Sequence, residues 1–242
     1  MSIPETISIC HRCESELQGA FCSQCGHPQK LERINGNYIL VEIGRVLNFD
    51  KGILYTIREL LLRPDSTIQQ FIHRDRNRIV KPIIFIIICS LIYTFAQQVL
   101  RFEDGYIAAG GLEDSTAFAI FTWIQQNYGY ANIIMAIFIA LWVKILFRKY
   151  NYNYFEILIL LFFIMGIGML IYTFFGIIES LTQSKVLHLG GMIGFFYASW
   201  AIGRFFDKRK KINYLKGFLA YILGFISFGL AAMLLGWVID LF

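Results

Sequence analysis

The sequence predicts an all-α membrane protein whose main part is a bundle of five transmembrane helices. Of the 242 residues, 57% are hydrophobic and only 16% are charged, whereas about a quarter of the residues in a soluble domain are charged. The shortage of charge is concentrated after Pro82, directly behind a cluster of basic residues. Five apolar runs long enough to cross a bilayer follow, which indicates several spans rather than one large soluble core.

Three regions follow from this pattern. We predict a polar head over residues 1–30, a linker with amphipathic helices over 31–81, and a five-span transmembrane domain over 82–242. The head contains no apolar stretch followed by a small-residue cleavage site, so we expect the first span to act as its own insertion signal.

The head carries the pattern C-x2-C-x8-C-x2-C, formed by Cys10, Cys13, Cys22 and Cys25. Two thiols separated by two residues can bind one metal ion from a tight turn, and two such turns complete the tetrahedral ligand set that zinc prefers. Gly26, directly after the last cysteine, suits such a turn. A reducing compartment disfavours disulfides. We therefore predict a small zinc ribbon with structural Zn²⁺, and free thiols or a redox pair are the alternative.

The composition of this ribbon bears on its partner. The ribbon carries basic or titratable nitrogen groups on His11, Arg12 and His27, and negative charges on Glu14 and Glu16. This is a poor match to the phosphates of a nucleic acid. We expect a protein partner at the ribbon and no nucleic acid.

Amphipathic helices are expected between the head and the first span. Apolar residues recur at helical spacing over 39–47 and again over 53–62, where Pro64 ends the pattern. Asp65 or Ser66 can cap a third short helix. These helices either pack on one another and under the bundle or lie in the cytoplasmic interface of the membrane, and we favour the interfacial placement.

A basic cluster lies immediately before the first span and consists of Arg74, Arg76, Arg78 and Lys81. Basic residues next to a span remain on the cytoplasmic side of the membrane. They also attract anionic lipid headgroups. We therefore predict that these four residues bind headgroups and that the N-terminus is cytoplasmic.

The expected spans are residues 82–100, 131–147, 155–178, 186–206 and 215–241. The connections after the second and fourth spans are basic, whereas those after the first and third are acidic or neutral. This alternation predicts a multi-pass protein of the cell (inner) membrane, with its C-terminus outside.

Small residues inside the third and fourth spans, Gly166, Gly168, Gly190 and Gly194, allow neighbouring helices to approach closely. Packing within one bundle is the favoured interpretation, and the contact of a homo-oligomer is the alternative. The spans carry almost no ionisable group away from their ends. Ion-coupled transport and intramembrane proteolysis both need such groups, so we expect no catalytic residues and no enzyme activity.

The run from Gly52 to Phe85, GILYTIRELLLRPDSTIQQFIHRDRNRIVKPIIF, follows the four cysteines. It resembles an uncharacterised bacterial family of zinc-ribbon multi-pass membrane proteins, a domain of unknown function. The shared signature is a leucine-rich helix, Arg-Pro, a short helix, a basic cluster and a proline before the first span. The arrangement is more distantly similar to the Yip-type five-span membrane proteins, whose eukaryotic members are associated with small GTPases and membrane traffic. Neither resemblance implies catalytic residues.

These observations favour a non-enzymatic integral membrane scaffold or adaptor. Its zinc ribbon and basic amphipathic region would recruit a protein partner or sense the membrane. The alternative is a transporter or a lipid-handling protein that acts through the bundle, with the glycines of the third and fourth spans shaping a groove.

Overall fold

The computed structural model describes residues 8–10, 13–17, 22–26, 52–103 and 116–240. The chain divides into two compact units, Met1–Leu47 and Asn48–Phe242. The predicted amphipathic segment over 39–47 and most of the predicted acidic connection after the first span lie outside the described residues.

The first unit contains a short pair of antiparallel strands, β1 (Ser8–Ile9) and β2 (Glu16–Leu17). Ser8 pairs with Leu17 and Ile9 pairs with Glu16. One cysteine turn lies between the two strands, and the other follows β2. The strand pair thus brings the two turns of the cysteine motif together.

The described part of the second unit is helical. In chain order its elements are α2 (Ile53–Leu62), α3 (Pro64–His73), α4 (Pro82–Leu100), α5 (Thr116–Gln126), α6 (Tyr128–Leu146), the 3-10 helix η1 (Arg148–Tyr150), α7 (Tyr154–Thr182), α8 (Leu187–Asp207) and α9 (Lys211–Asp240).

Four of these helices, α4, α6, α7 and α9, are long and apolar enough to cross a membrane. The prediction of a helical membrane protein is confirmed to that extent. The fourth predicted span corresponds to α8, which has 21 residues but is not among the four. His188, Arg204 and several glycines lower its mean hydropathy, so the five-span architecture is not confirmed.

The longest apolar helices extend beyond the predicted spans. Helix α7 has 29 residues and is therefore about 43 Å long at 1.5 Å per residue, against about 30 Å for the hydrocarbon core of a bilayer. A capping box starts it: Asn153 Oδ1 accepts the Glu156 N–H at 2.9 Å, and Glu156 Oε2 accepts the Asn153 N–H at 2.8 Å. This cap fixes the start of the helix at Tyr154, one residue before the predicted span, and the extra length lies at the C-terminal end, which reaches Thr182.

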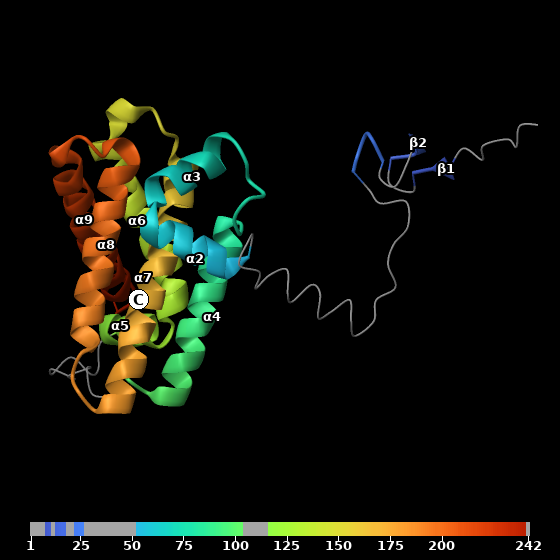
Figure 1. Cartoon of the computed structure of the whole chain (residues 1–242). Coiled ribbons are helices and arrows are strands. Elements are labelled where there is room, and N and C mark those ends of the chain that lie inside the picture. The colour runs from blue at the N-terminus through green and yellow to red at the C-terminus, as the bar shows by residue number, and fades with distance from the viewer. Residues whose placement is uncertain (1–7, 11–12, 18–21, 27–51, 104–115, 241–242) are drawn as a thin grey trace, which may run out of the picture. The chain divides into compact units, whose positions relative to one another are not determined.

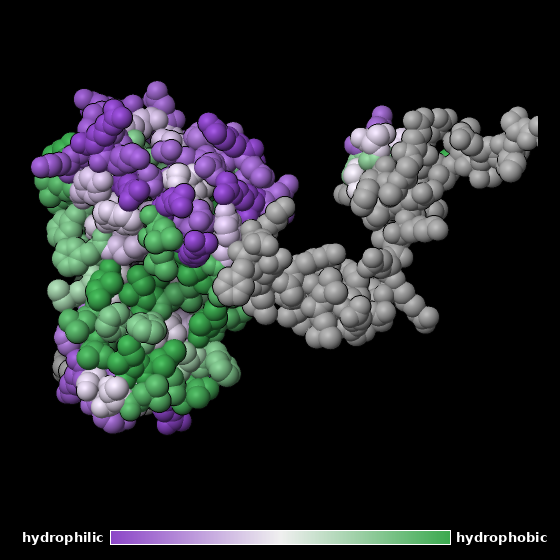
Figure 2. Space-filling view, viewed as in Figure 1, coloured by the Kyte–Doolittle hydropathy of each residue, from purple (hydrophilic) through white to green (hydrophobic). Residues whose placement is uncertain are grey.

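The outer surface of the helical unit is apolar between two polar ends. Figure 2 shows an apolar band with hydrophilic surface above and below it. On α4, for example, Ile83, Leu91 and Phe95 are exposed, the last to 71%. Contiguous exposed apolar surface of this extent fits contact with lipid rather than with water.

Helices α2 and α3 pack against the longer helices. Leu60, Ile68 and Phe71 are buried in the same core as Phe85 and Phe163. The Phe163 ring lies 5.5 Å from that of Phe71 and 5.7 Å from that of Phe85, between ring centroids. The packing alternative therefore describes the buried face of these helices, which bears the apolar residues that complete the core. The interfacial placement stays a prediction for their remaining faces.

The opposite face of α2 is exposed and includes Leu54, Leu61 and Leu62. Pro64 starts α3 as its first helical residue, as proline commonly does. Asp65 therefore lies inside the first turn and does not cap it; the N-cap is Arg63, which makes no side-chain capping bond.

The connections between the longer helices alternate between the two ends of the helical unit. The α6–α7 and α8–α9 connections lie together at the upper end in Figure 1, close to α3. They contain the basic groups of Arg148, Lys149 and residues 208–211. Basic charge is thus gathered at one end of the unit, as the sequence predicts.

Candidate metal centre and bundle cavity

The four cysteines converge in the first unit. Their sulfur atoms all lie within 4.8 Å of one another. Cys10 Sγ is 3.5 Å from Cys25 Sγ, and Cys13 Sγ is 3.5 Å from Cys22 Sγ. The thiols are free, since a disulfide would need about 2.05 Å. This group could hold one metal ion.

Two similar turns position these cysteines. The Glu14 N–H donates to the Cys10 carbonyl oxygen and the Gly26 N–H to the Cys22 carbonyl oxygen, both at 2.9 Å. Glu14 and Gly26 each follow the second cysteine of a pair and have left-handed φ values of 58° and 69°. Sequence reasoning identified Gly26 but missed Glu14, because glutamate carries no signal for this conformation.

Ser15 lies against two of the thiols. Its Oγ is 3.0 Å from Cys13 Sγ and 3.1 Å from Cys22 Sγ, so the hydroxyl can donate to either sulfur. Donation from Ser15 lowers the pKa of both thiols, that of Cys22 to about 6. The thiolate is the form that binds metal. Sequence reasoning did not find Ser15, because its role depends on how the turn folds.

The predicted headgroup-binding residues Arg74, Arg76, Arg78 and Lys81 are all exposed. Arg78 also has a structural role. Its Nε donates to the Tyr55 hydroxyl at 3.0 Å and its Nη1 to Gln70 Oε1 at 2.9 Å. The Tyr55 hydrogen bond raises the pKa of Arg78. The loop before α4 is thereby attached to α2 and α3.

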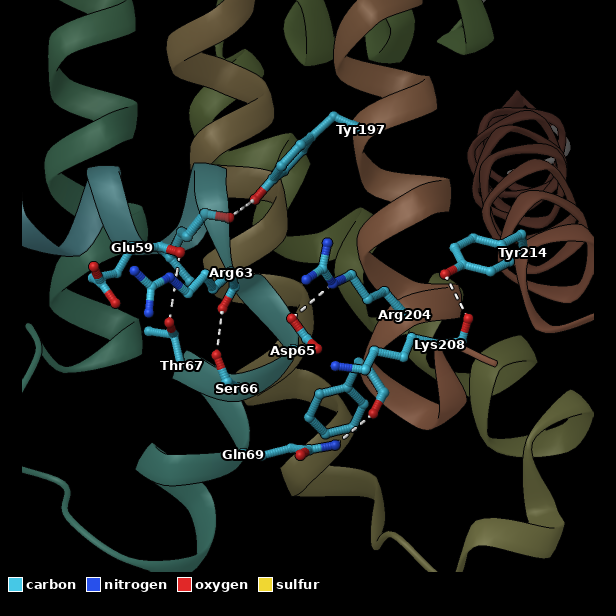
Figure 3. Close-up of polar contacts among 12 residues, drawn as sticks. Glu59, Arg63, Asp65, Ser66, Thr67, Gln69, Tyr197, Arg204, Lys208 and Tyr214 are labelled. Atoms are coloured by element: carbon cyan, nitrogen blue, oxygen red, sulfur yellow. Dashed lines mark hydrogen bonds and ion pairs between the residues drawn. The ribbon is translucent and has the colours of Figure 1, made fainter. Parts of the chain in front are cut away.

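An ion pair joins α3 to α8. Arg204 Nε lies 2.8 Å from Asp65 Oδ1, and Figure 3 shows the two side chains facing each other across the helices. The Arg204 guanidinium also lies 5.1 Å from the centroid of the Trp200 ring. In the sequence, Arg204 falls at the end of the fourth predicted span, before a basic connection. Its ion pair cannot be inferred there, because the carboxylate that binds it is 139 residues away in the chain.

Two further hydrogen bonds cross the same interface (Figure 3). Gln69 Nε2 donates to the Phe205 carbonyl oxygen at 2.7 Å, and the Tyr197 hydroxyl donates to the Leu60 carbonyl oxygen at 3.0 Å. Leu60 lies near the C-terminal end of α2, where carbonyl groups have no partner within the helix. These contacts fix α2 and α3 to α8.

Two of the four predicted packing glycines lie where no side chain fits. A β-carbon at Gly166 would lie 2.7 Å from the Phe85 ring, and one at Gly190 would lie 2.6 Å from Phe175 Cβ. A β-carbon at Gly194 would lie 3.5 Å from the Gly168 carbonyl oxygen, which is an ordinary contact. Gly166 therefore lets α7 approach α4, and Gly190 and Gly194 let α8 approach α7.

Gly168 differs from the other three, because a β-carbon there would meet nothing within 4 Å. It lines a cavity of about 320 Å³ between helices α5 to α9. Gly190, Gly191 and Gly194 also line this cavity, and its other walls are mainly apolar and aromatic side chains. The spacing of glycines in the sequence cannot distinguish packing positions from cavity positions, since both have the same residue type.

An aromatic cluster closes one end of the cavity. The ring centroids of Tyr93, Tyr128 and Tyr172 lie 5.1–6.2 Å apart, and the last two line the cavity. The Tyr93 hydroxyl donates to Glu103 Oε1 at 2.7 Å. Glu103 is buried, and in the sequence it belongs to the acidic connection predicted after the first span. Sequence reasoning missed this group because the turn after α4, which places Glu103 against Tyr93, leaves no signal in the residue pattern.

Residues 50–94 match the model of a family described as "Protein of unknown function (DUF3667)". The matched segment contains α2, α3 and the first part of α4, and with them the signature that begins at Gly52 and ends at Phe85. No curated protein matches the chain, and no solved structure matches it.

Proposed function

We propose that this protein is an integral membrane scaffold or adaptor whose N-terminal ribbon binds Zn²⁺ and recruits a protein partner on the cytoplasmic side. The observation that carries the proposal is the convergence of four thiols within 4.8 Å, in a unit separate from the helices that are able to span a membrane. A ribbon without a core of its own on a membrane anchor is suited to presenting a binding surface.

The thiol geometry supports zinc as the metal. A tetrahedral site with Zn–S bonds of about 2.3 Å has its sulfur atoms about 3.8 Å apart, and two sulfur pairs lie at 3.5 Å. Four protein ligands close the site, so the metal would be structural. Zinc binding on the order of 10 kcal/mol is enough to hold a short segment folded.

The same proposal includes five spans, with α8 as the fourth. Two observations support it: α8 packs within the helical unit between α7 and α9, and basic connections gather at one end. The basic end would be cytoplasmic and the C-terminus outside. Reporter fusions after Lys210 and after Phe242 test this, because opposite sides are expected and the same side would contradict it.

Headgroup contact is proposed for the exposed basic residues beside the bundle. Arg74, Arg76 and Lys81 are exposed, and α2 exposes the apolar side chains of Leu61 and Leu62. Exposed basic groups suit contact with anionic headgroups, and exposed leucines suit contact with acyl chains at the membrane boundary. Charge reversal at Arg74 and Arg76 is expected to weaken binding to anionic relative to zwitterionic vesicles.

The decisive experiment compares the intact protein, Cys22→Ser and the matched variant Ser23→Ala, which changes an exposed residue of the same turn. Each is purified from membranes after crosslinking, and zinc content is measured alongside the crosslinked proteins. The proposal expects about one zinc and one reproducible partner for the intact protein and Ser23→Ala, with both lost in Cys22→Ser. A partner that Cys22→Ser retains without zinc would overturn the role of the ribbon.

A further inference from the structure

The cavity lined by the five helices α5 to α9 has a size and a lining that suit an apolar ligand. Its volume is about 320 Å³. A cavity of about 150 Å³ with apolar walls already remains dry and binds small apolar molecules. The backbone of Gly168, Gly191 and Gly194 forms part of the wall, and most other lining groups are hydrocarbon. Water and ions would find few partners there.

The cavity is elongated along the helices. On α6 its lining runs from Tyr128 to Met135, and on α7 from Ile164 to Tyr172. These separations of seven and eight residues correspond to about 10 and 12 Å along a helix axis. A flexible chain fits this shape better than a compact ring does.

The cavity opens at a lipid-facing part of the surface. Gly191 and Phe225 line it and are also exposed, the phenylalanine to 60%. Phe225 lies on α9, which is apolar enough to span a membrane, and its exposed neighbour Ile226 is apolar. The ligand would therefore enter from the acyl-chain region of the bilayer rather than from water.

A second apolar pocket adjoins the first. It has a volume of about 330 Å³ and shares Ile124 and Phe228 with the cavity. It lies between α5, α6 and α9. Two adjoining apolar pockets of similar size suit a lipid with two chains better than a free fatty acid with one.

Two polar side chains that line the cavity lie near the start of α6. Tyr128 begins α6, and Asn132 follows one turn later and is buried. Tyr172 lies beside Tyr128, with 5.8 Å between ring centroids. Hydroxyl and amide groups near the end of a spanning helix lie at the depth where lipid ester groups meet the acyl chains.

We propose that the bundle binds one diacyl phospholipid from the bilayer, with one acyl chain in the cavity beside Gly168, the other in the adjoining pocket, and the ester end toward Tyr128 and Asn132. This goes beyond a scaffold, since it makes the bundle a lipid-binding element. It does not depend on the ribbon.

The test uses the full-length protein in nanodiscs that contain a phospholipid with a photoactivatable diazirine in one acyl chain. After irradiation, the labelled residues are identified by mass spectrometry. Label on cavity residues such as Met135 and Met165 supports the proposal. Label confined to exposed lipid-facing residues such as Phe95 would overturn it.

Two glycine variants provide the matched comparison. A β-carbon at Gly168 or at Gly229 would meet nothing within 4 Å, but only Gly168 is among the residues lining the cavity. Gly168→Leu is expected to reduce cavity labelling about tenfold, whereas Gly229→Leu leaves it unchanged. Equal labelling of both folded variants would overturn the proposal.

Folding of each variant is checked by gel filtration and by its thermal unfolding midpoint. If Gly168→Leu does not fold, Gly191→Leu takes its place, because its β-carbon would meet only Tyr172, at 3.8 Å. A parallel sample contains a photoactivatable free fatty acid at the same mole fraction. Cavity labelling by the fatty acid but not by the phospholipid would overturn the assignment of a two-chain lipid.

Discussion

The ion pair between Asp65 and Arg204 is expected to couple α3 to α8 measurably. The two side chains are 12% and 27% exposed, and Nε lies 2.8 Å from Oδ1. Exposed pairs contribute about 0–1 kcal/mol, whereas removing one partner of a fully buried pair costs about 3–5 kcal/mol. This pair lies between those limits, so we expect a coupling free energy of about 2 kcal/mol.

A double-mutant cycle measures this coupling. Asp65→Asn, Arg204→Gln and the double variant are unfolded by denaturant in a mild detergent, and the free energies of unfolding are compared. The pair formed by Asp207 and Lys210 serves as a control, because its atoms are 3.2 Å apart and its side chains are 28% and 61% exposed. Its coupling is expected to be about 0.5 kcal/mol or less.

The salt dependence provides a second criterion. Salt screens exposed charges more strongly than partly buried ones. The coupling between Asp65 and Arg204 should therefore persist at high salt, while that of the control pair disappears. A coupling no larger than that of the control would refute the conclusion that this ion pair attaches α3 to the bundle.

Three further predictions concern local backbone geometry. Gly26→Ala is expected to weaken metal binding about tenfold, because a side chain at φ = 69° costs about 1–2 kcal/mol although its β-carbon would touch nothing. Glu14→Gly should strengthen metal binding for the same reason. Competition with a chelator measures the metal affinity of both variants. Asn153→Ala removes the capping box of α7 and should lower the free energy of unfolding by about 1 kcal/mol, as denaturant titration would show. Gly203→Leu should prevent folding, since its β-carbon would lie 2.7 Å from the α9 backbone. Gel filtration measures the amount of folded protein, and a normal amount would contradict this packing.

The sequence was sufficient for features that depend on local pattern. The spacing of Cys10, Cys13, Cys22 and Cys25 predicted a group of thiols, and the described structure brings all four together. The apolar runs predicted helices, and four of them have the length and composition of spans. Both patterns connect residues that are close together in the chain, so they can be recognised in a single sequence.

Features that depend on distant contacts could not be predicted. The sequence predicts Asp65 or Ser66 as a helix cap, but Asp65 binds Arg204 because α3 packs on α8. Glu103 falls in the acidic connection predicted after the first span, but it is buried and accepts a hydrogen bond from the Tyr93 hydroxyl. In both cases the carboxylate has a partner that only tertiary structure supplies, and charge patterning along the chain does not reveal it.

The segment that matches the family model does not form a core of its own. It ends within α4, and the buried faces of α2 and α3 are completed by α7 and α8, through Phe163 and Phe205 among others. Asp65 and Gln69 likewise bind groups on α8. A segment that buries its apolar face against other helices and binds them through its polar groups cannot be stable alone. Residues 50–94 therefore form one half of an interface whose other half is the bundle, and α7 and α8, against which this half packs, also contribute residues to the wall of the cavity.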